Sequence, residues 1–324
     1  MRVFGSVVFA LFAALSPSLL AQWPSVKTPN VPRNPDGTVN MTAPAPRTPD
    51  GHVDISGIWA AGGGGGGGRG GRGRAAGDGA GAPGAAPAGA APAGAAAGNA
   101  PAAGAPAGGG RAGRGAGNAA PAEPSNSPPQ ATFFNVGQNL PGGMAPMTPW
   151  AAELRKQRAS DNAKDNPDAH CLPIGHLQLH LHPQPRKYFW TPGEIVMVWE
   201  SNYGLRHIYL DGRQPPARDS DAVPYWYGYT TGKWEGDTLV ATTTHIRDGM
   251  WLDVNGTPLT DQATIVERFR RPNFGSLEID ITIDDPKAFT MPFTVRVNQR
   301  IMVDTELIEF ICNENEQSSL HFAK

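Results

Sequence analysis

A strong charge of either sign is missing from this sequence. Its 27 Lys and Arg residues nearly balance 29 Asp and Glu residues, for a formal net charge of −2. A chain so close to neutrality has no overall electrostatic preference for nucleic acid or for a membrane surface. The sequence also lacks a Gly-x-Ser-x-Gly motif, a cysteine in a nucleophilic context and a phosphate-binding loop, so covalent hydrolase and nucleotide-binding functions have no support.

After the N-terminus, no apolar run is long enough to cross a bilayer, which takes about 20 residues. At the N-terminus, Met1-Arg2 precedes the apolar run Val7–Leu15, Ser16-Pro17-Ser18 follows, and the small residue Ala21 precedes Gln22. This order predicts a cleaved secretory signal peptide at residues 1–21, with an uncleaved anchor as the alternative. We therefore expect a secreted or periplasmic protein with no integral membrane segment after cleavage.

Large apolar side chains are almost absent from residues 60–130, which consist mainly of Gly, Ala and Pro. Without such side chains nothing offsets the conformational entropy lost on ordering, so we predict a disordered linker. Its Arg-Gly run at Gly68–Arg74 resembles an RNA-binding segment. Behind an export signal we interpret it as a spacer and expect no nucleic-acid partner.

The remaining sequence divides into a Pro-rich segment, 22–59, and one domain, 131–324. Ile58 and Trp59 would be exposed in an isolated segment, so we expect a short strand there that docks on the domain. Only two cysteines are present, Cys171 and Cys312. In an exported protein they most simply form one disulfide, and two buried thiols are the alternative.

Period-two alternation dominates the sequence from His176 onward. A helix is predicted near 148–162, because Thr148 can cap it and Pro149 suits its first position. Short turns and no helical crossovers predict about eight or nine antiparallel strands, a meander closing into an all-β, lipocalin-like barrel, with a β-sandwich as the alternative. The expected strands are His176–His182, Glu194–Glu200, Leu205–Leu210, Trp226–Trp234, Thr238–His245, Thr264–Arg270, Leu277–Ile283, Phe293–Val303 and Glu306–Cys312.

Several short motifs together resemble a family of uncharacterised exported proteins abundant in acidobacteria and related soil bacteria. The matching segments are Pro49–Gly51, Ser56–Trp59, Cys171–Pro173, Arg206–Arg213, Gly232–Val240, Glu267–Arg271, Thr282–Lys287 and Cys312–Asn315. The resemblance spans nearly all of the chain outside the signal and linker, and it implies export without an assigned activity. This chain departs from the family pattern at His176, His180 and His182, so the resemblance implies no metal site common to the family there.

The same three histidines are the metal-ligand candidates. On a strand, His176, His180 and His182 would share one face, and three imidazoles can bind Zn²⁺ with a position left open. We favour a solvent-facing polar stripe instead, and accordingly predict no metal and no cofactor.

A binding site for a small amphipathic ligand is the leading functional hypothesis. Alternation places Arg268 and Arg270 on one face of a strand and Glu267 and Phe269 on the other. An inward arginine could clamp a carboxylate inside an aromatic-lined cavity; in the alternative, the arginines form surface ion pairs and the aromatic residues belong to the core. The candidate ligand-binding residues are Arg206, Arg268, Arg270, Trp199, Tyr209 and Trp226.

Two further functions stay open at this point. A hydrolase or lyase of the envelope would use His207, Asp211 and Glu200 in the mouth of the barrel, as a histidine with carboxylate partners. A structural surface protein would have no cavity. Nothing in the sequence indicates an oligomeric state.

Overall fold

The computed structural model describes residues 26–62, 127–201, 204–217, 225–312 and 314. The predicted signal peptide and nearly all of the predicted linker lie outside the described residues. Within the described part, no helix has the length and apolar character needed to cross a membrane.

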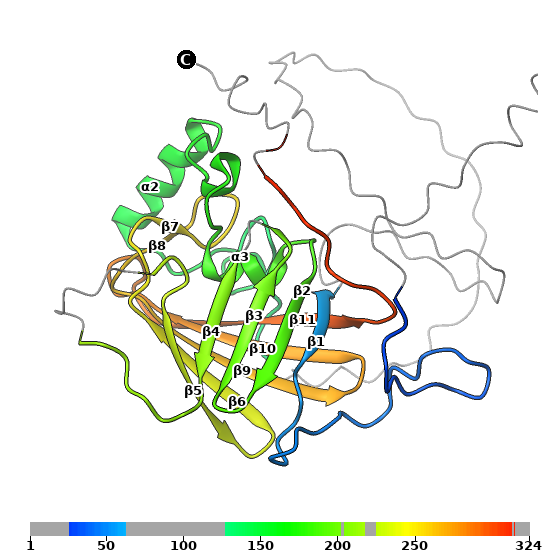
Figure 1. The fold of residues 1–324 in the computed structure, drawn as a ribbon. Helices are drawn as coiled ribbons and strands as arrows, with labels where there is room; N and C mark the ends of the chain where they lie inside the picture. The colour runs from blue at the N-terminus through cyan, green and yellow to red at the C-terminus, as the bar shows by residue number, and fades with distance from the viewer. Residues whose placement is uncertain (1–25, 63–126, 202–203, 218–224, 313, 315–324) are drawn as a thin grey trace, which may run out of the picture. The chain divides into compact units, whose positions relative to one another are not determined.

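Nine strands of the described chain form one closed barrel, so the predicted all-β barrel is confirmed and the β-sandwich is not observed (Figure 1). Around the barrel the strand order is β1-β11-β10-β9-β6-β5-β4-β3-β2, and β7 and β8 form a separate two-stranded sheet. The bounds are β1 (Gly57–Ala61), β2 (Arg186–Thr191), β3 (Glu194–Trp199), β4 (Leu205–Tyr209), β5 (Tyr229–Glu235), β6 (Thr238–Thr244), β7 (Met250–Trp251), β8 (Pro258–Leu259), β9 (Thr264–Asn273), β10 (Ser276–Asp284) and β11 (Phe293–Met302).

One seam of the barrel departs from the predicted antiparallel meander. Strands β4 and β5 pair in parallel, with Ile208 opposite Thr230, whereas the other neighbouring strands of the barrel are antiparallel. A parallel pair cannot be joined by a tight hairpin, and residues 210–228 provide the longer connection that it requires. The sheet is therefore mixed.

Strand β1, whose last two residues Ala60 and Ala61 fall inside the predicted linker 60–130, closes the barrel. Trp59 lies opposite Ile301 of β11 on one side and opposite Arg186 of β2 on the other. The side chain of Trp59 is fully buried, and its Nε1 donates to the carbonyl of Ile55. Among the described residues, the first strand thus lies between the first and last barrel strands of the segment 127–312.

The predicted helix near 148–162 is α2 (Pro149–Ser160), and its cap is the predicted one. Thr148 accepts a hydrogen bond from the backbone N–H of Ala151, and Pro149 occupies the first turn. A short 3₁₀ helix, η1 (Pro167–His170), follows α2.

The strand predicted at 176–182 is wrong, because this segment forms helix α3 (His176–Leu181). Leu177 and Leu179 are buried, and so are His176 and His180, so the alternation does not distinguish a core face from a solvent face. The backbone N–H of His182 instead donates to the carbonyl of Gln178, as in a helix. The strand predicted at 306–312 is likewise not formed, and β2 was not predicted.

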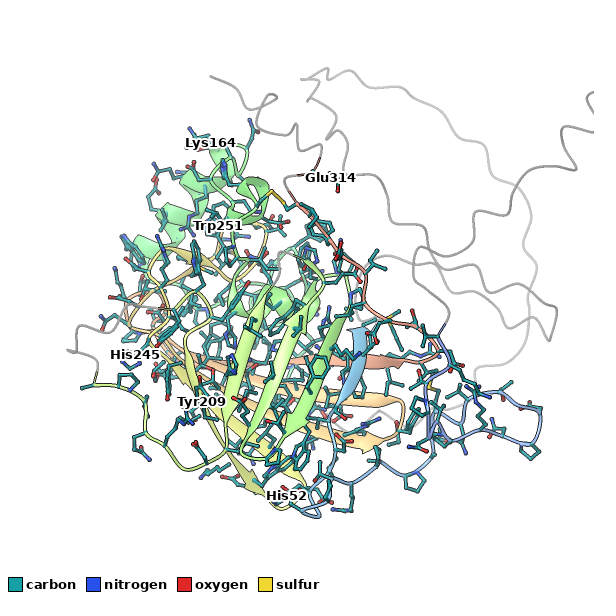
Figure 2. The ribbon with its side chains drawn as sticks, viewed as in Figure 1. His52, Lys164, Tyr209, His245, Trp251 and Glu314 are labelled. Atoms are coloured by element: carbon teal, nitrogen blue, oxygen red, sulfur yellow. A yellow bond between two sulfur atoms is a disulfide. The ribbon has the colours of Figure 1, made fainter. Side chains whose placement is uncertain are left out.

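Different segments cover the two ends of the barrel. Helices α2 and α3 and the β7–β8 sheet lie near one end, where Figure 2 also shows Trp251. At the other end His52 stacks on Trp234 of β5, with ring centroids 4.7 Å apart. The interior between them is lined by buried apolar side chains and by a small group of polar side chains that meet at Glu267.

Candidate functional site

Glu267 on β9 lies at the centre of a buried polar cluster inside the barrel. The residue is 0% exposed, and both carboxylate oxygens are surrounded by donors. Arg206 NH1 donates to Oε1 at 3.1 Å and Arg206 NH2 donates to Oε2, a bidentate ion pair. The Nε2 atoms of His180 and His176 lie 2.8 Å from Oε1 and 3.1 Å from Oε2.

Helix α3 supplies the two histidines because positions i and i+4 share one helical face. The helix is held at the barrel end by buried side chains that donate to its carbonyls. Trp199 Nε1 donates to Leu179 at 2.8 Å, and Arg186 donates to His180 at 2.9 Å and to His182. The imidazoles therefore project into the barrel on a fixed element.

Electrostatics fix the protonation states in the cluster. Burial alone would raise the pKa of Glu267, but the charge of Arg206 and the contacts to the histidines hold it well below its ordinary value. Burial lowers the pKa of His180 to about 4 and also lowers the pKa of His176. At neutral pH the cluster thus contains one carboxylate, one guanidinium and two neutral imidazoles.

The far sides of both imidazoles also face polar groups. Nδ1 of His180 lies 3.2 Å from Gln299 Nε2 and 3.4 Å from the hydroxyl of Tyr188, which itself donates to Gln299 Oε1 at 3.0 Å. Nδ1 of His176 makes no hydrogen bond of normal geometry, although the nearby backbone of Tyr227 favours a proton on that ring.

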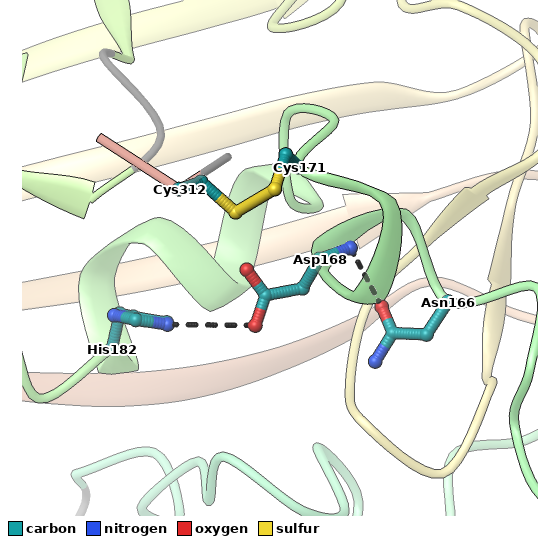
Figure 3. Close-up of a disulfide and its surroundings, with 5 residues drawn as sticks. All are labelled: Asn166, Asp168, Cys171, His182 and Cys312. Atoms are coloured by element: carbon teal, nitrogen blue, oxygen red, sulfur yellow. Dashed lines mark hydrogen bonds and ion pairs between the residues drawn. A yellow bond between two sulfur atoms is a disulfide. The ribbon is translucent and has the colours of Figure 1, made fainter. Parts of the chain in front are cut away.

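The third histidine of the predicted trio lies outside the cluster. His182 follows α3, and its Nε2 is 3.9 Å from a carboxylate oxygen of Asp168, close to the Cys171–Cys312 bond (Figure 3). Because the segment is helical, His176 and His180 share a face that His182 does not. The third potential metal ligand beside His176 and His180 is the carboxylate of Glu267. Glu267 is distant in sequence, so the local spacing of the histidines did not indicate it.

The predicted disulfide is present. Cys171 and Cys312 are bonded, with their Cα atoms 5.5 Å apart. The bond connects the segment just before α3 to the segment after β11.

The six predicted ligand-binding residues do not converge on one pocket. Arg206 and Trp199 are buried in the interior, where Arg206 is occupied by Glu267. The other four residues lie elsewhere: Arg268 pairs with Glu235, Arg270 pairs with Glu278, Tyr209 stacks with His207, and Trp226 lies under Arg247. The expected opposition of the two faces of β9 holds, but its inward face carries Glu267 and Phe269.

The three predicted catalytic residues are also apart. His207 Nδ1 pairs with Glu194 at 3.1 Å, on the outer side of the barrel. Asp211 forms an ion pair with Arg213, and buried Glu200 accepts a hydrogen bond from the backbone N–H of Ile308. The structure does not bring these side chains together into a dyad.

A cavity of about 400 Å³ lies where the N-terminal segment 26–58 meets the barrel. Its apolar lining includes Val26, Val31, Ile58, Phe274, Ile301 and Met302. Its charged lining includes Lys187, which pairs with Glu306 at 2.6 Å, and Arg271. A second cavity of about 390 Å³ adjoins the same part of the chain and is lined by Arg47 and Trp190, among others.

Arg271 is the unusual member of this lining. It is 5% exposed, and its NH1 and NH2 groups donate to the backbone carbonyls of Asp54, Ser56 and Phe274. Nε makes no hydrogen bond, and burial lowers the pKa of Arg271 to about 10, with Asp54 acting in the opposite direction. Alternation along β9 places Arg271 on the inward face with Glu267 and Phe269, which is the signal that could have identified it.

Comparison of the chain with protein-family models, curated proteins and solved structures gave no match.

Proposed function

We propose that this chain is an exported binding protein that holds a small amphipathic anion in the cavity beside Arg271. The observation that carries the proposal is a buried guanidinium, hydrogen-bonded only to backbone carbonyls, in the wall of a largely apolar cavity. Burying a charge is costly unless it is paired, and the one carboxylate that acts on Arg271, Asp54, offsets the effect of burial only in part. A carboxylate or sulfonate in the cavity would supply that counter-charge through charge-assisted hydrogen bonds.

The size and lining of the cavity support a small ligand. A volume of about 400 Å³ falls within the range typical of small-molecule sites, which combine apolar walls with a few polar groups. Ile58, Phe274 and Ile301 would contact the apolar part of the ligand. The Lys187–Glu306 pair lies in the same lining and adds charges of both signs near the anion.

Export is supported by the N-terminal sequence and by the disulfide, which is compatible with an oxidising compartment outside the cytoplasm. The shared motifs support membership of the exported soil-bacterial family. A hydrolase or lyase that uses His207, Asp211 and Glu200 is not proposed, because these side chains are engaged with different partners.

The test is a titration with two anionic amphiphiles, dodecanoate and anilinonaphthalene sulfonate, and with uncharged dodecanol. We expect saturable binding of both anions, with dodecanol binding more weakly. Arg271→Met should weaken binding of the anions by about 10- to 100-fold, the range for hydrogen bonds to a charged group. Arg270→Met is the matched control, since its side chain lies on the outer face of the same strand.

Arg271 also holds backbone carbonyls, so Arg271→Met could fail to fold. Met302→Trp is therefore the second variant, because it fills the cavity without removing a charge. Binding of both anions by Met302→Trp with the affinity of the unmodified protein would refute the proposed site. Absence of binding to the unmodified protein would do the same.

A further inference from the structure

We propose that His176, His180 and Glu267 form a binding site for a divalent transition-metal ion of the Zn²⁺ class inside the barrel. One ligand atom from each residue lies within 4.8 Å of the other two. Two imidazoles and one carboxylate are a donor set that zinc prefers, and three protein ligands leave a fourth position open. The site lies inside the barrel, so the proposal does not depend on ligand binding beside Arg271.

The three ligands are held on rigid elements. His176 and His180 are one turn apart on α3, which is fixed by hydrogen bonds from Trp199 and Arg186. Glu267 lies within β9, which pairs with β6 on one side and with β10 on the other. A metal site needs this kind of support, because its ligands must keep a defined geometry.

The residues behind the ligands match the outer shell of a metal site. Ligating carboxylates are usually hydrogen-bonded, as Glu267 is to Arg206. A ligating histidine usually donates its second ring N–H to an acceptor, and the Tyr188 hydroxyl oxygen, 3.4 Å from His180 Nδ1, can accept because its own proton goes to Gln299 Oε1.

The charge of Arg206 favours an anion at the fourth coordination position of a bound metal ion. The charges of Arg206 and Glu267 cancel, so the charge of a bound divalent ion would be uncompensated inside the barrel. An anion such as hydroxide in the open position reduces that charge. Because the ligands are fully buried, we expect the ion to exchange slowly with solution.

The test is the metal content of the full-length protein, expressed without a polyhistidine tag and refolded with excess Zn²⁺ before removal of unbound ions. We expect about one equivalent of zinc, a higher melting temperature than that of chelator-treated protein, and a Co²⁺ absorption spectrum typical of nitrogen and oxygen ligands. His180→Gln should bind zinc at least about 10-fold more weakly, because mutation of even an outer-shell partner typically weakens metal affinity by 10- to 100-fold and this variant removes a ligand.

His182→Gln is the matched control, because it alters a histidine of the same segment that lies outside the cluster. It should bind zinc as the unmodified protein does. The double variant Arg206→Met/Glu267→Gln removes both buried charges together, so loss of zinc there is not confounded by an unpaired buried arginine. Substoichiometric zinc in the unmodified protein after refolding, or equal zinc in His180→Gln, would overturn the proposal and leave the cluster as a hydrogen-bonded ion pair.

Discussion

Gly175, the residue that caps the N-terminus of α3, is where a single added methyl group should have the largest local effect. A Cβ built on it would lie 1.5 Å from the carbonyl oxygen of Trp251. Its φ of −60° suits any residue, so the cost of substitution arises from this contact alone. Gly175→Ala should lower the free energy of unfolding by about 3 kcal/mol, measured by urea denaturation.

Gly212→Ala is the comparison for that measurement. Gly212 has a φ of +81° and no atom within 4 Å of an added Cβ, so the expected loss is about 1 kcal/mol from backbone strain. Similar losses in the two variants would show that α3 is not packed closely against Trp251.

At the scale of single residues, alternation predicted which side chains of β9 share a face but not which face points inward. Glu267 and Phe269 do oppose Arg268 and Arg270, as expected. The partner of Glu267, however, is Arg206 on another strand, and no local pattern links residues 61 positions apart. The cluster therefore could not be assembled from the sequence, although its histidines were recognised as candidate ligands.

Among the elements, the N-terminal segment 26–40 is the one whose attachment depends most visibly on pH. Asp304, just after β11, accepts hydrogen bonds from Arg33 NH2 at 2.6 Å and from the backbone N–H of Thr28 at 3.0 Å. These donors lower the pKa of Asp304 below its ordinary value of 3.8. Because this pKa is lowered, ionised Asp304 stabilises the attached segment at pH values above 3.8. That stabilisation is lost as the pH falls through the pKa of Asp304 in the folded protein.

We therefore expect acid to release the segment 26–40 before the barrel opens. Hydrogen exchange followed by mass spectrometry should show faster exchange in this segment below about pH 4 while β10 stays protected. Asp304→Asn should reproduce the effect at pH 7, and asparagine tolerates the φ of +57° at this position. Simultaneous loss of protection in the segment and in β10 would contradict this order.

The type and bounds of an element were predicted well where only one of its faces is buried, and its type was predicted wrongly in α3, where the polar side chains are buried as well. Strands β3 and β10 alternate between buried and more exposed side chains, and their predicted bounds are close to the observed ones. In α3 the alternation of leucine and histidine imitates a strand, because the polar residues are buried for a reason that is not local: their contact with Glu267.

At the scale of the whole molecule, the composition of the sequence was enough to predict how the chain divides into segments. The order of the strands around the barrel could not be predicted from the sequence. Burial of Ile58 and Trp59 was predictable from their apolar side chains. The position of β1 between β2 and β11 was not, because it depends on pairing between distant parts of the chain. The parallel β4–β5 seam was missed because the segment between these strands resembles an ordinary loop.

The disulfide is the element of the fold that acts on the whole chain, because it closes a loop between residues 141 positions apart. A cross-link over such a separation restricts the unfolded chain, with a chain-entropy estimate of about 5 kcal/mol. Cys312 follows the last barrel strand and Cys171 precedes α3, so removal of the bond should leave the strand pairing of the barrel intact.

The double variant Cys171→Ser/Cys312→Ser should therefore lower the free energy of unfolding by about 3–5 kcal/mol while the folded protein keeps its far-ultraviolet circular dichroism spectrum. Because the unfolded chain without the cross-link exposes more surface, the slope of the urea transition should also increase. Reduction of the unmodified protein should give the same midpoint as the double variant. If neither the double substitution nor reduction changes the midpoint of the urea transition, the disulfide restricts a segment that is released before global unfolding. The stability of the barrel would then come from its closed sheet alone.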